Sequence, residues 1–233
     1  MATVIAGLEA DDDATDALPA VLARACVQVL PVAGAGISST NQLRVPLGAS
    51  DSTVVRAERL QTTLGEGPCL TATSTSMPVR ATASMMASRW PVFHQELLRQ
   101  TPYRTIVSLP LQSHQRLFAA LDLYSTDEVA FAHLALDEIQ AEVADPLASM
   151  LVTQPHTTEP GQEDLPAWLD SGRVRERMKV WVSIGMLMET GLLTNTEALS
   201  VLRAYAYTHD TTLDELAAQL TTRQVSVDTV LDS

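Results

Sequence analysis

The side chains most capable of chemistry in this sequence are basic residues near its C-terminal end. Arg203 stands alone in the stretch LRAYAY, three residues before Ala206 and four before Tyr207. Residues at these spacings share one face of a helix, so Arg203 and Tyr207 should project together. A guanidinium beside an aromatic ring can contact a phosphate and stack on an unpaired base. The alternative is a surface salt bridge between Arg203 and an acidic residue of the preceding helix.

A second basic group opens the helix predicted upstream of Arg203. Its members alternate along the chain, which spreads them around a helix rather than along one face. They are Arg173, Arg175, Arg177 and Lys179. This group is either a solvated helix start or a set of phosphate contacts. His209, which follows the next predicted helix, either caps that helix or contacts the same ligand.

No combination of nucleophile, general base and metal ligands meets the geometric minimum for catalysis. Cys26 and Cys69 have no CxxC partner and no zinc-like spacing, so we expect two buried thiols in a reducing compartment. The histidines are scattered and have no regularly spaced carboxylate partner; they are His94, His114, His133, His156 and His209. We therefore expect no enzymatic activity, no metal site and no cofactor.

The composition is that of a folded but acidic protein. Of the 233 residues, 46% are hydrophobic, enough for a sizeable core. The net charge of −13 argues against nucleic-acid binding unless a local motif supplies positive charge. The N-terminus does not resemble a signal peptide, and no apolar run approaches the roughly 20 residues that cross a bilayer. We expect a cytoplasmic protein.

The order of predicted elements in the first 150 residues indicates an α+β domain with an antiparallel sheet. Residues 1–15 are acidic and are expected to form a flexible arm, and Pro146 should kink or break the last predicted helix. Helices are predicted at 16–30, 52–64, within 89–102 and at 128–151, with a short one beginning at Pro68. Strands are predicted at 32–40, 43–50, 78–82, 104–112 and 116–125.

Residues 153–172 change character and form a predicted linker, with three prolines, four acidic residues and no basic one. Beyond it, helices are predicted at 173–189, 194–207 and 211–220, with a possible fourth at 226–231. In the first of these, Met178, Val182, Leu187 and Met188 are expected to face a small helical core. Gly185 lies inside that helix, which predicts close approach of another helix or of a ligand.

Four short motifs of the first region occur in the order and spacing of GAF domains. They are LGEGPC (64–69), RWPVF (89–93), VSLPL (107–111) and AALDLYS (119–125). Residues 16–152 therefore resemble a GAF domain, a fold that binds small molecules or cyclic nucleotides over an antiparallel sheet and often dimerises. The resemblance implies a ligand pocket at Arg80, Trp90, Phe93, His94 and Tyr103, with Arg44 and Arg56 as further candidates.

The region from 173 to 233 is similar to an ANTAR domain. The similarity rests on IGMLME (184–189), EALSVLRAYA (197–206) and LDELA (213–217). It implies a three-helix output domain that binds paired stem-loops in leader transcripts, prevents transcription termination and usually acts as a dimer. The implied RNA contacts are Arg177, Lys179, Ser183, Arg203, Tyr207 and His209.

The charge of this helical region leaves the function open. Residues 173–233 hold six basic and eight acidic residues, whereas RNA affinity depends on phosphate neutralisation. We expect a signal-responsive RNA-binding antitermination regulator: a homodimer with RNA and an unknown small-molecule or protein signal as partners, and no membrane partner. One alternative is a sensor or dimerisation scaffold whose helical region docks a protein. Another is a small-molecule binding protein whose helical tail only caps the sensor.

Overall fold

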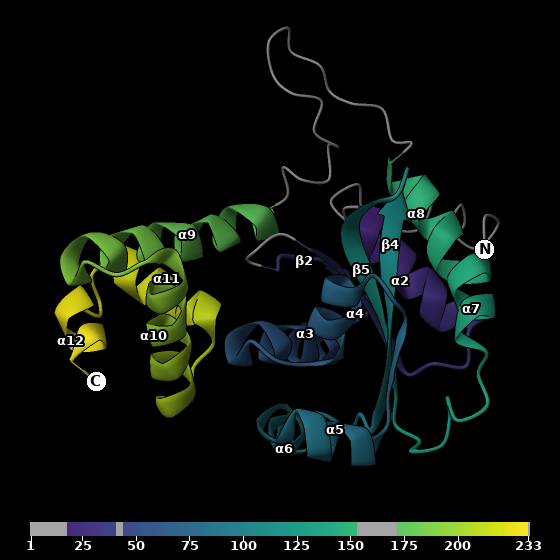
Figure 1. The fold of residues 1–233 in the computed structure, drawn as a ribbon. Helices are drawn as coiled ribbons and strands as arrows, with labels where there is room; N and C mark the ends of the chain where they lie inside the picture. The colour runs from purple at the N-terminus through teal and green to yellow at the C-terminus, as the bar shows by residue number, and fades with distance from the viewer. Residues whose placement is uncertain (1–17, 41–43, 153–171, 233) are drawn as a thin grey trace, which may run out of the picture.

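The computed structural model describes residues 18–40, 44–152 and 172–232, with side chains from Arg177 onward in the last segment (Figure 1). The predicted arm at 1–15 and nearly all of the predicted linker at 153–172 lie outside these residues. The helices are α2 (Leu18–Val29), α3 (Ser52–Leu64), α4 (Pro68–Thr75), α5 (Ala83–Arg89), α6 (Pro91–Gln100), α7 (Leu136–Ile139), the π-helix η1 (Gln140–Ala144), α8 (Asp145–Val152), α9 (Gly172–Gly191), α10 (Asn195–Thr208), α11 (Leu213–Thr221) and α12 (Val227–Leu231). The strands are β1 (Gly34–Ser39), β2 (Pro46–Ala49), β3 (Val79–Ala81), β4 (Thr105–Ser113) and β5 (Arg116–Ser125).

The strands form one antiparallel sheet in the order β2-β1-β5-β4-β3, and all five lie where the sequence predicts a strand. The predicted hairpin between β4 and β5 is confirmed. It turns at His114 and Gln115, which both adopt positive φ angles (48° and 62°). Its register places Leu109 opposite Leu121 and Ser108 opposite Asp122. Residues opposite each other point to the same face of the sheet, so this register groups apolar residues on one face and polar residues on the other.

Helices cover both faces of the sheet (Figure 1). On one face, α2, α7 and α8 pack over an apolar core to which β5 contributes Leu121 and Leu123. On the other face, α3, α5 and α6 pack over a second core that includes Ile106 and Tyr124. Because side chains alternate along a strand, Asp122 points toward this second group of helices and is fully buried there. The first face is lined mainly by apolar side chains, whereas the second also carries a buried charged group.

Two helix predictions in this region need correction. The sequence predicts one helix at 128–151, but the helical segment begins at Leu136, and residues 129–133 form turns. Pro146 does not break it; instead, the π-helix η1 widens the helix immediately before the proline. Proline removes one backbone N–H from the helical ladder, and π-helical turns are a common way of accommodating such a disruption. The short helix α5, which is capped by Thr82, was not predicted.

The C-terminal helices α9, α10, α11 and α12 match the predicted positions and share one core that includes Ile184, Leu202 and Leu216. Thr194 and Thr212 begin α10 and α11 with complete capping boxes, in which a glutamate three residues later bonds back to the cap. Three of the side chains predicted to face the core of α9 do not: Met178, Val182 and Met188 are 54%, 51% and 36% exposed. Because α9 is apolar on several sides, the position of its partner helices decides which side is buried.

The helical region lies against the GAF-like region. Helices α10 and α11 contact α3, and α9 contacts β2 (Figure 1). Within the part of the chain that the structure describes, no helix is both long and apolar enough to cross a membrane.

Candidate sensing site and its contact with the helical region

A cluster of charged side chains is buried between the sheet and α3. The Nη2 atom of Arg44 donates to Oε2 of Glu58 at 2.5 Å and to Oδ2 of Asp122 at 2.7 Å. The side chain of Arg44 is 4% exposed, and both carboxylates are fully buried. These three residues come from the approach to β2, from α3 and from the central strand β5. One guanidinium therefore joins three separate elements of the domain through two carboxylates.

Neutral polar side chains extend this cluster. Tyr124 donates its hydroxyl to Oε1 of Glu58 at 2.6 Å, and Gln61 donates to Oδ2 of Asp122 at 2.8 Å. The amide oxygen of Gln61 accepts from the backbone N–H of Cys69 at 2.9 Å, at the start of α4. The GPC turn of the LGEGPC motif is thus hydrogen-bonded to the charged cluster. A change in the cluster would reach α4 through Gln61.

The cluster is electrostatically unbalanced, because two buried carboxylates share one guanidinium. Burial raises the pKa of Glu58 to about 8; the charge of Arg44 lowers it and the charge of Asp122 adds to the increase. At neutral pH the pair of carboxylates therefore retains a proton. Burial also raises the pKa of the Cys69 thiol well above its usual value, so this cysteine remains a protonated, weakly nucleophilic thiol.

Hydrogen-bonding capacity is left over in the cluster. Among the described residues, Oδ1 of Asp122, Oγ of Ser108 and Nε of Arg44 are buried without a partner. Buried polar groups are nearly always paired with protein or water, so these three atoms leave the cluster with unused hydrogen-bonding capacity.

The residues predicted as a ligand pocket are only partly brought together. Trp90, Phe93 and Tyr103 belong to the second core and are 6%, 0% and 2% exposed, and Tyr103 stacks near Tyr124 with ring centroids 4.8 Å apart. Arg80 lies elsewhere and donates to the backbone oxygen of Leu134. The ligand role of these residues stays a prediction.

The remaining candidates differ in surroundings. Nε2 of His94 is buried without a partner among the described residues. Arg44, which the resemblance suggested as a further pocket residue, is the centre of the charged cluster. Glu58, Gln61 and Asp122 are not among the site residues that the sequence predicts. One signal was available: an aspartate between Leu121 and Leu123 in a strand marks a polar position on the opposite face.

The residues predicted to contact RNA are placed in different environments. Arg177 is 2% exposed and pairs with Asp214 at 2.6 Å, and burial lowers its pKa. Ser183 is fully buried and donates to the backbone oxygen of Lys179. Tyr207 is 48% exposed. Tyr207 and the partly exposed Lys179 are accessible on the surface, whereas Arg177 and Ser183 support the helical core.

His209 takes the capping role that the sequence allowed. It is the C-cap of α10, its ring stacks on Tyr205 with centroids 3.8 Å apart, and its Nδ1 lies 2.9 Å from the backbone oxygen of the same tyrosine. The residue remains exposed. Gly185, which predicted a close neighbour, has open space where a Cβ would stand.

Arg203 lies in the contact between the helical region and α3. Its Nε donates to the backbone oxygen of Thr62 at 3.2 Å, and its guanidinium packs over Gly65, where a Cβ would come within 2.7 Å of it. Gly65 ends α3 in a left-handed conformation, with φ of 70°. Gly65 of the LGEGPC motif therefore contacts Arg203, the arginine predicted to bind RNA. Glycine is required at this position both for its backbone angle and for the space taken by Arg203.

Two further contacts fasten this interface. The backbone N–H of Leu213, the first residue of α11, donates to Oγ1 of Thr63 at 3.2 Å. Arg99, in the last turn of α6, pairs with Asp210 at 2.7 Å. These contacts join the C-terminal halves of α3 and α6 to helix α10, to the α10–α11 connection and to the start of α11.

Comparison with known proteins assigns the first region. The model of the GAF domain family matches residues 13–151, and the match ends before the helical region. No curated protein matches the sequence. Among solved structures, the chain is similar to the GAF domain from a phosphoenolpyruvate-protein phosphotransferase of Coxiella burnetii, with 16% identity, 65% of this chain and 89% of that chain covered, and a TM-score of 0.45. Because the family model spans more than half of the sequence, the chain belongs to the GAF domain family.

Proposed function

We propose that this protein is a signal-responsive RNA-binding antitermination regulator, in which the GAF domain controls an ANTAR-like output. The observation that carries the proposal is the position of Arg203. This residue is the best-placed phosphate contact of the helical region by sequence, and its guanidinium is occupied by Thr62 and Gly65 of the GAF domain. The role proposed is regulatory and not catalytic.

The contact suggests how a signal would be transmitted. Burial lowers the pKa of Arg203, which means that its charge is partly desolvated in the docked arrangement. A guanidinium packed against Gly65 and bonded to Thr62 is less accessible to an RNA phosphate than a free one. Release of α10 from α3 would free Arg203 beside the exposed ring of Tyr207, and both would then be available to RNA. A signal that favours the released arrangement would raise RNA affinity by its differential affinity for the two states.

The acidic character of the helical region makes this control effective. Arg177 is used internally by Asp214, so few basic side chains remain for phosphate contacts in the docked arrangement. Each phosphate contact contributes to RNA affinity and to its salt dependence. When few such contacts exist, the loss of one removes a large fraction of the electrostatic affinity for RNA. Dimerisation would raise affinity for paired stem-loops by effective concentration.

The test is binding of the full chain to a paired-hairpin RNA, titrated across salt. We expect saturable binding that weakens with salt, and Arg203→Ala should weaken it and reduce the salt slope by about 1. The matched control is Arg116→Gln, which replaces an exposed arginine of the β4–β5 hairpin. This variant should bind RNA as the wild type does. Thr63→Val removes the side-chain oxygen that accepts the interdomain bond from Leu213 and should raise RNA affinity. No binding at low salt by the folded protein would refute RNA recognition.

A second candidate is a scaffold whose helical region docks a protein. It is favoured by the exposed apolar side chains of α9, Met178, Val182 and Met188, which lie with Gly185 at helical spacing. The same face is a candidate for the predicted homodimer. Sedimentation of the wild type and of Val182→Glu would test it: a dimer disrupted by the charge, with RNA binding absent in both, would favour the scaffold.

A further inference from the structure

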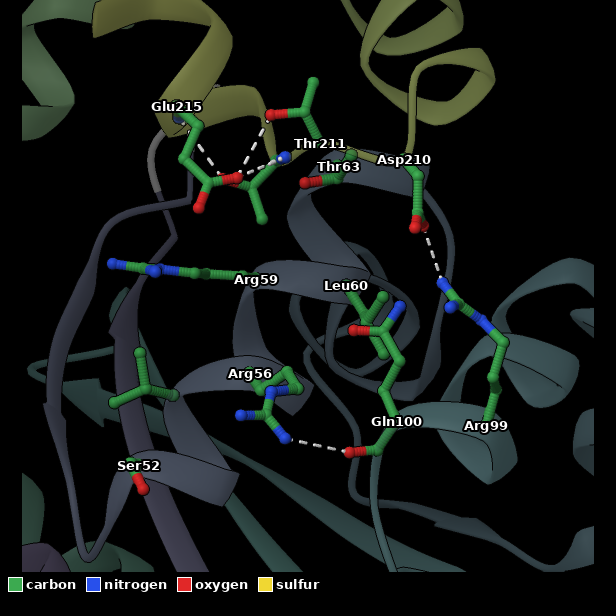
Figure 2. Close-up of a pocket in the computed structure, with 12 residues that line it drawn as sticks. Ser52, Arg56, Arg59, Leu60, Thr63, Arg99, Gln100, Asp210, Thr211 and Glu215 are labelled. Atoms are coloured by element: carbon green, nitrogen blue, oxygen red, sulfur yellow. Dashed lines mark hydrogen bonds and ion pairs between the residues drawn. The ribbon is translucent and has the colours of Figure 1, made fainter.

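A groove lies between the GAF domain and the helical region, next to the contact made by Arg203. Its larger part has a volume of about 670 Å³ (Figure 2). One wall is formed by α3 and the end of α6, and the other by the α10–α11 connection and the start of α11. An adjoining cavity of about 400 Å³ shares residues of both walls, including Leu60, Arg99 and Asp210. Cavities of this combined size hold small-molecule ligands.

Three arginines line the larger part of the groove. Arg56 and Arg59 lie one turn apart on α3, and Arg99 reaches the groove from α6 (Figure 2). The whole chain has only 15 basic residues and a net charge of −13, so three arginines at one cavity make a strong local departure from its acidic character. Asp210 and Glu215 also line the groove, so its arginines outnumber its carboxylates by three to two, and this excess of positive charge favours anionic ligands.

Two of these guanidiniums have donors to spare. Arg56 donates from Nη1 to the backbone oxygen of Gln100 at 3.2 Å. Arg59 makes no hydrogen bond or ion pair with any residue that the structure describes, although its charge contributes to the low pKa of Glu215, after the larger effect of the Thr212 backbone N–H. An arginine carries five N–H donors in a fixed fork, so most of this donor capacity is unused.

The carboxylates on the opposite wall are already engaged. Oε2 of Glu215 accepts three hydrogen bonds from Thr211 and Thr212 as part of the capping box of α11. Arg99 pairs with Asp210 on the opposite wall and with Glu96 of its own helix, each at 2.7 Å. Arg99 and Asp210 are both more than half exposed, so solvent screens their pair and an anion can compete for it. The carboxylates therefore leave the positive side of the groove open to a competing anion.

From these observations we infer that the groove is a binding site for a small phosphate-bearing ligand, with Arg56 and Arg59 as its anchors and Arg99 as a third contact. The guanidinium fork matches phosphate oxygens in a bidentate geometry, and several arginines suit a group with two negative charges. The exposed ring of Tyr207 lines the adjoining cavity, where a planar ring attached to the phosphate could stack on it.

Such a ligand would touch both parts of the protein. Its phosphate would contact α3 and α6 of the GAF domain, and its other groups would face Thr211 and Tyr207 of the helical region. Binding would therefore depend on the relative position of the two parts, and it would change that position in return. This inference goes beyond the proposed function and does not depend on it, because phosphate binding is measured without RNA.

The experiment is isothermal titration of the full chain at low salt with adenosine monophosphate, pyrophosphate and adenosine. We expect saturable binding of at least one phosphate compound, weakening with salt, and none of adenosine. Arg56→Gln/Arg59→Gln should raise the dissociation constant about a hundredfold, since each of the two lost charge-assisted contacts contributes about tenfold. Arg116→Gln, an exposed arginine far along the chain from the groove, should bind as the wild type does.

The outcomes separate the source of the phosphate and can overturn the site. Binding of pyrophosphate alone assigns the groove to a free inorganic phosphate; tighter binding of the nucleotide that is lost in Tyr207→Ala assigns it to a nucleotide. Absence of binding by both phosphate compounds, equal affinity in the Arg56→Gln/Arg59→Gln variant, or an equal loss in Arg116→Gln would overturn the inference. Circular dichroism of each variant establishes that it is folded. Failure of RNA binding leaves these results unaffected.

Discussion

The charged cluster under α3 should make the stability of this protein depend on pH in an unusual direction. Glu58 and Asp122 share one guanidinium, that of Arg44, and burial raises the pKa of Glu58 to about 8 from an ordinary value of 4.5. The folded protein therefore holds a proton over a pH range in which the unfolded chain has released it. The contribution of this proton is fully present below the pKa of the unfolded chain. It is lost as the pH rises through the pKa of the folded protein.

The magnitude follows from linkage. Between the two pKa values the folded state binds about one proton more than the unfolded state, so the free energy of unfolding falls by about 1.4 kcal/mol per pH unit. From about pH 5.5 to about pH 7.5 the cluster should therefore lower the stability of the protein by about 2–3 kcal/mol. Glu58→Gln cannot ionise, so the variant should lack this decrease.

The assay is urea denaturation of the wild type and Glu58→Gln at both pH values. Glu142→Gln is the matched control, because Glu142 is exposed on η1 and should retain the wild-type dependence. The ionisable groups other than those at positions 58 and 142 are common to all three proteins and cancel in the comparison. The reasoning is refuted if Glu58→Gln loses as much stability as the wild type over this range, or if the wild type gains stability.

Three further substitutions test other contacts by thermal or urea unfolding. Asp214→Ala leaves the buried Arg177 without its carboxylate and should cost about 3–5 kcal/mol, whereas Asp214→Ala matching the wild type would mean that the ion pair contributes nothing. Gly48→Ala places a Cβ against the backbone of Pro19 and should lower the free energy of unfolding by about 1–3 kcal/mol. An unchanged unfolding midpoint would contradict this close approach. Arg99→Ala removes an exposed ion pair and should leave the midpoint unchanged, because solvent screens the charges; a clear decrease would show that the interdomain pair is structural.

Local patterns in the sequence predicted most elements of the fold. The alternation in 104–112 and 116–125 identified β4 and β5, and the short polar gap between them identified their hairpin. The threonines followed by glutamate three residues later are consistent with the observed starts of α10 and α11. These signals involve residues within a few positions of one another, which is why they can be recognised without knowledge of the fold.

The buried face of α9 shows where local patterns stop. Apolar residues occur on several sides of this helix, so its periodicity favours no single face. The sequence predicted Met178, Val182 and Met188 as buried, and these are exposed, whereas the fourth prediction, Leu187, is confirmed. The packing of α10 and α11 buries Val180 and Ile184 beside Leu187. The positions of the partner helices, and not the helix itself, made this choice.

The sequence by itself determined the GAF domain, its sheet and the helices that follow, because hydrophobic period, caps and turns act locally. The tertiary structure decided the candidate sites. Arg44 meets Asp122 from 78 positions away, and Arg203 meets Thr62 from 141. No local pattern relates residues at such separations. Whether an arginine is buried with carboxylates, docked on another domain or open to a ligand depends on what the fold brings beside it.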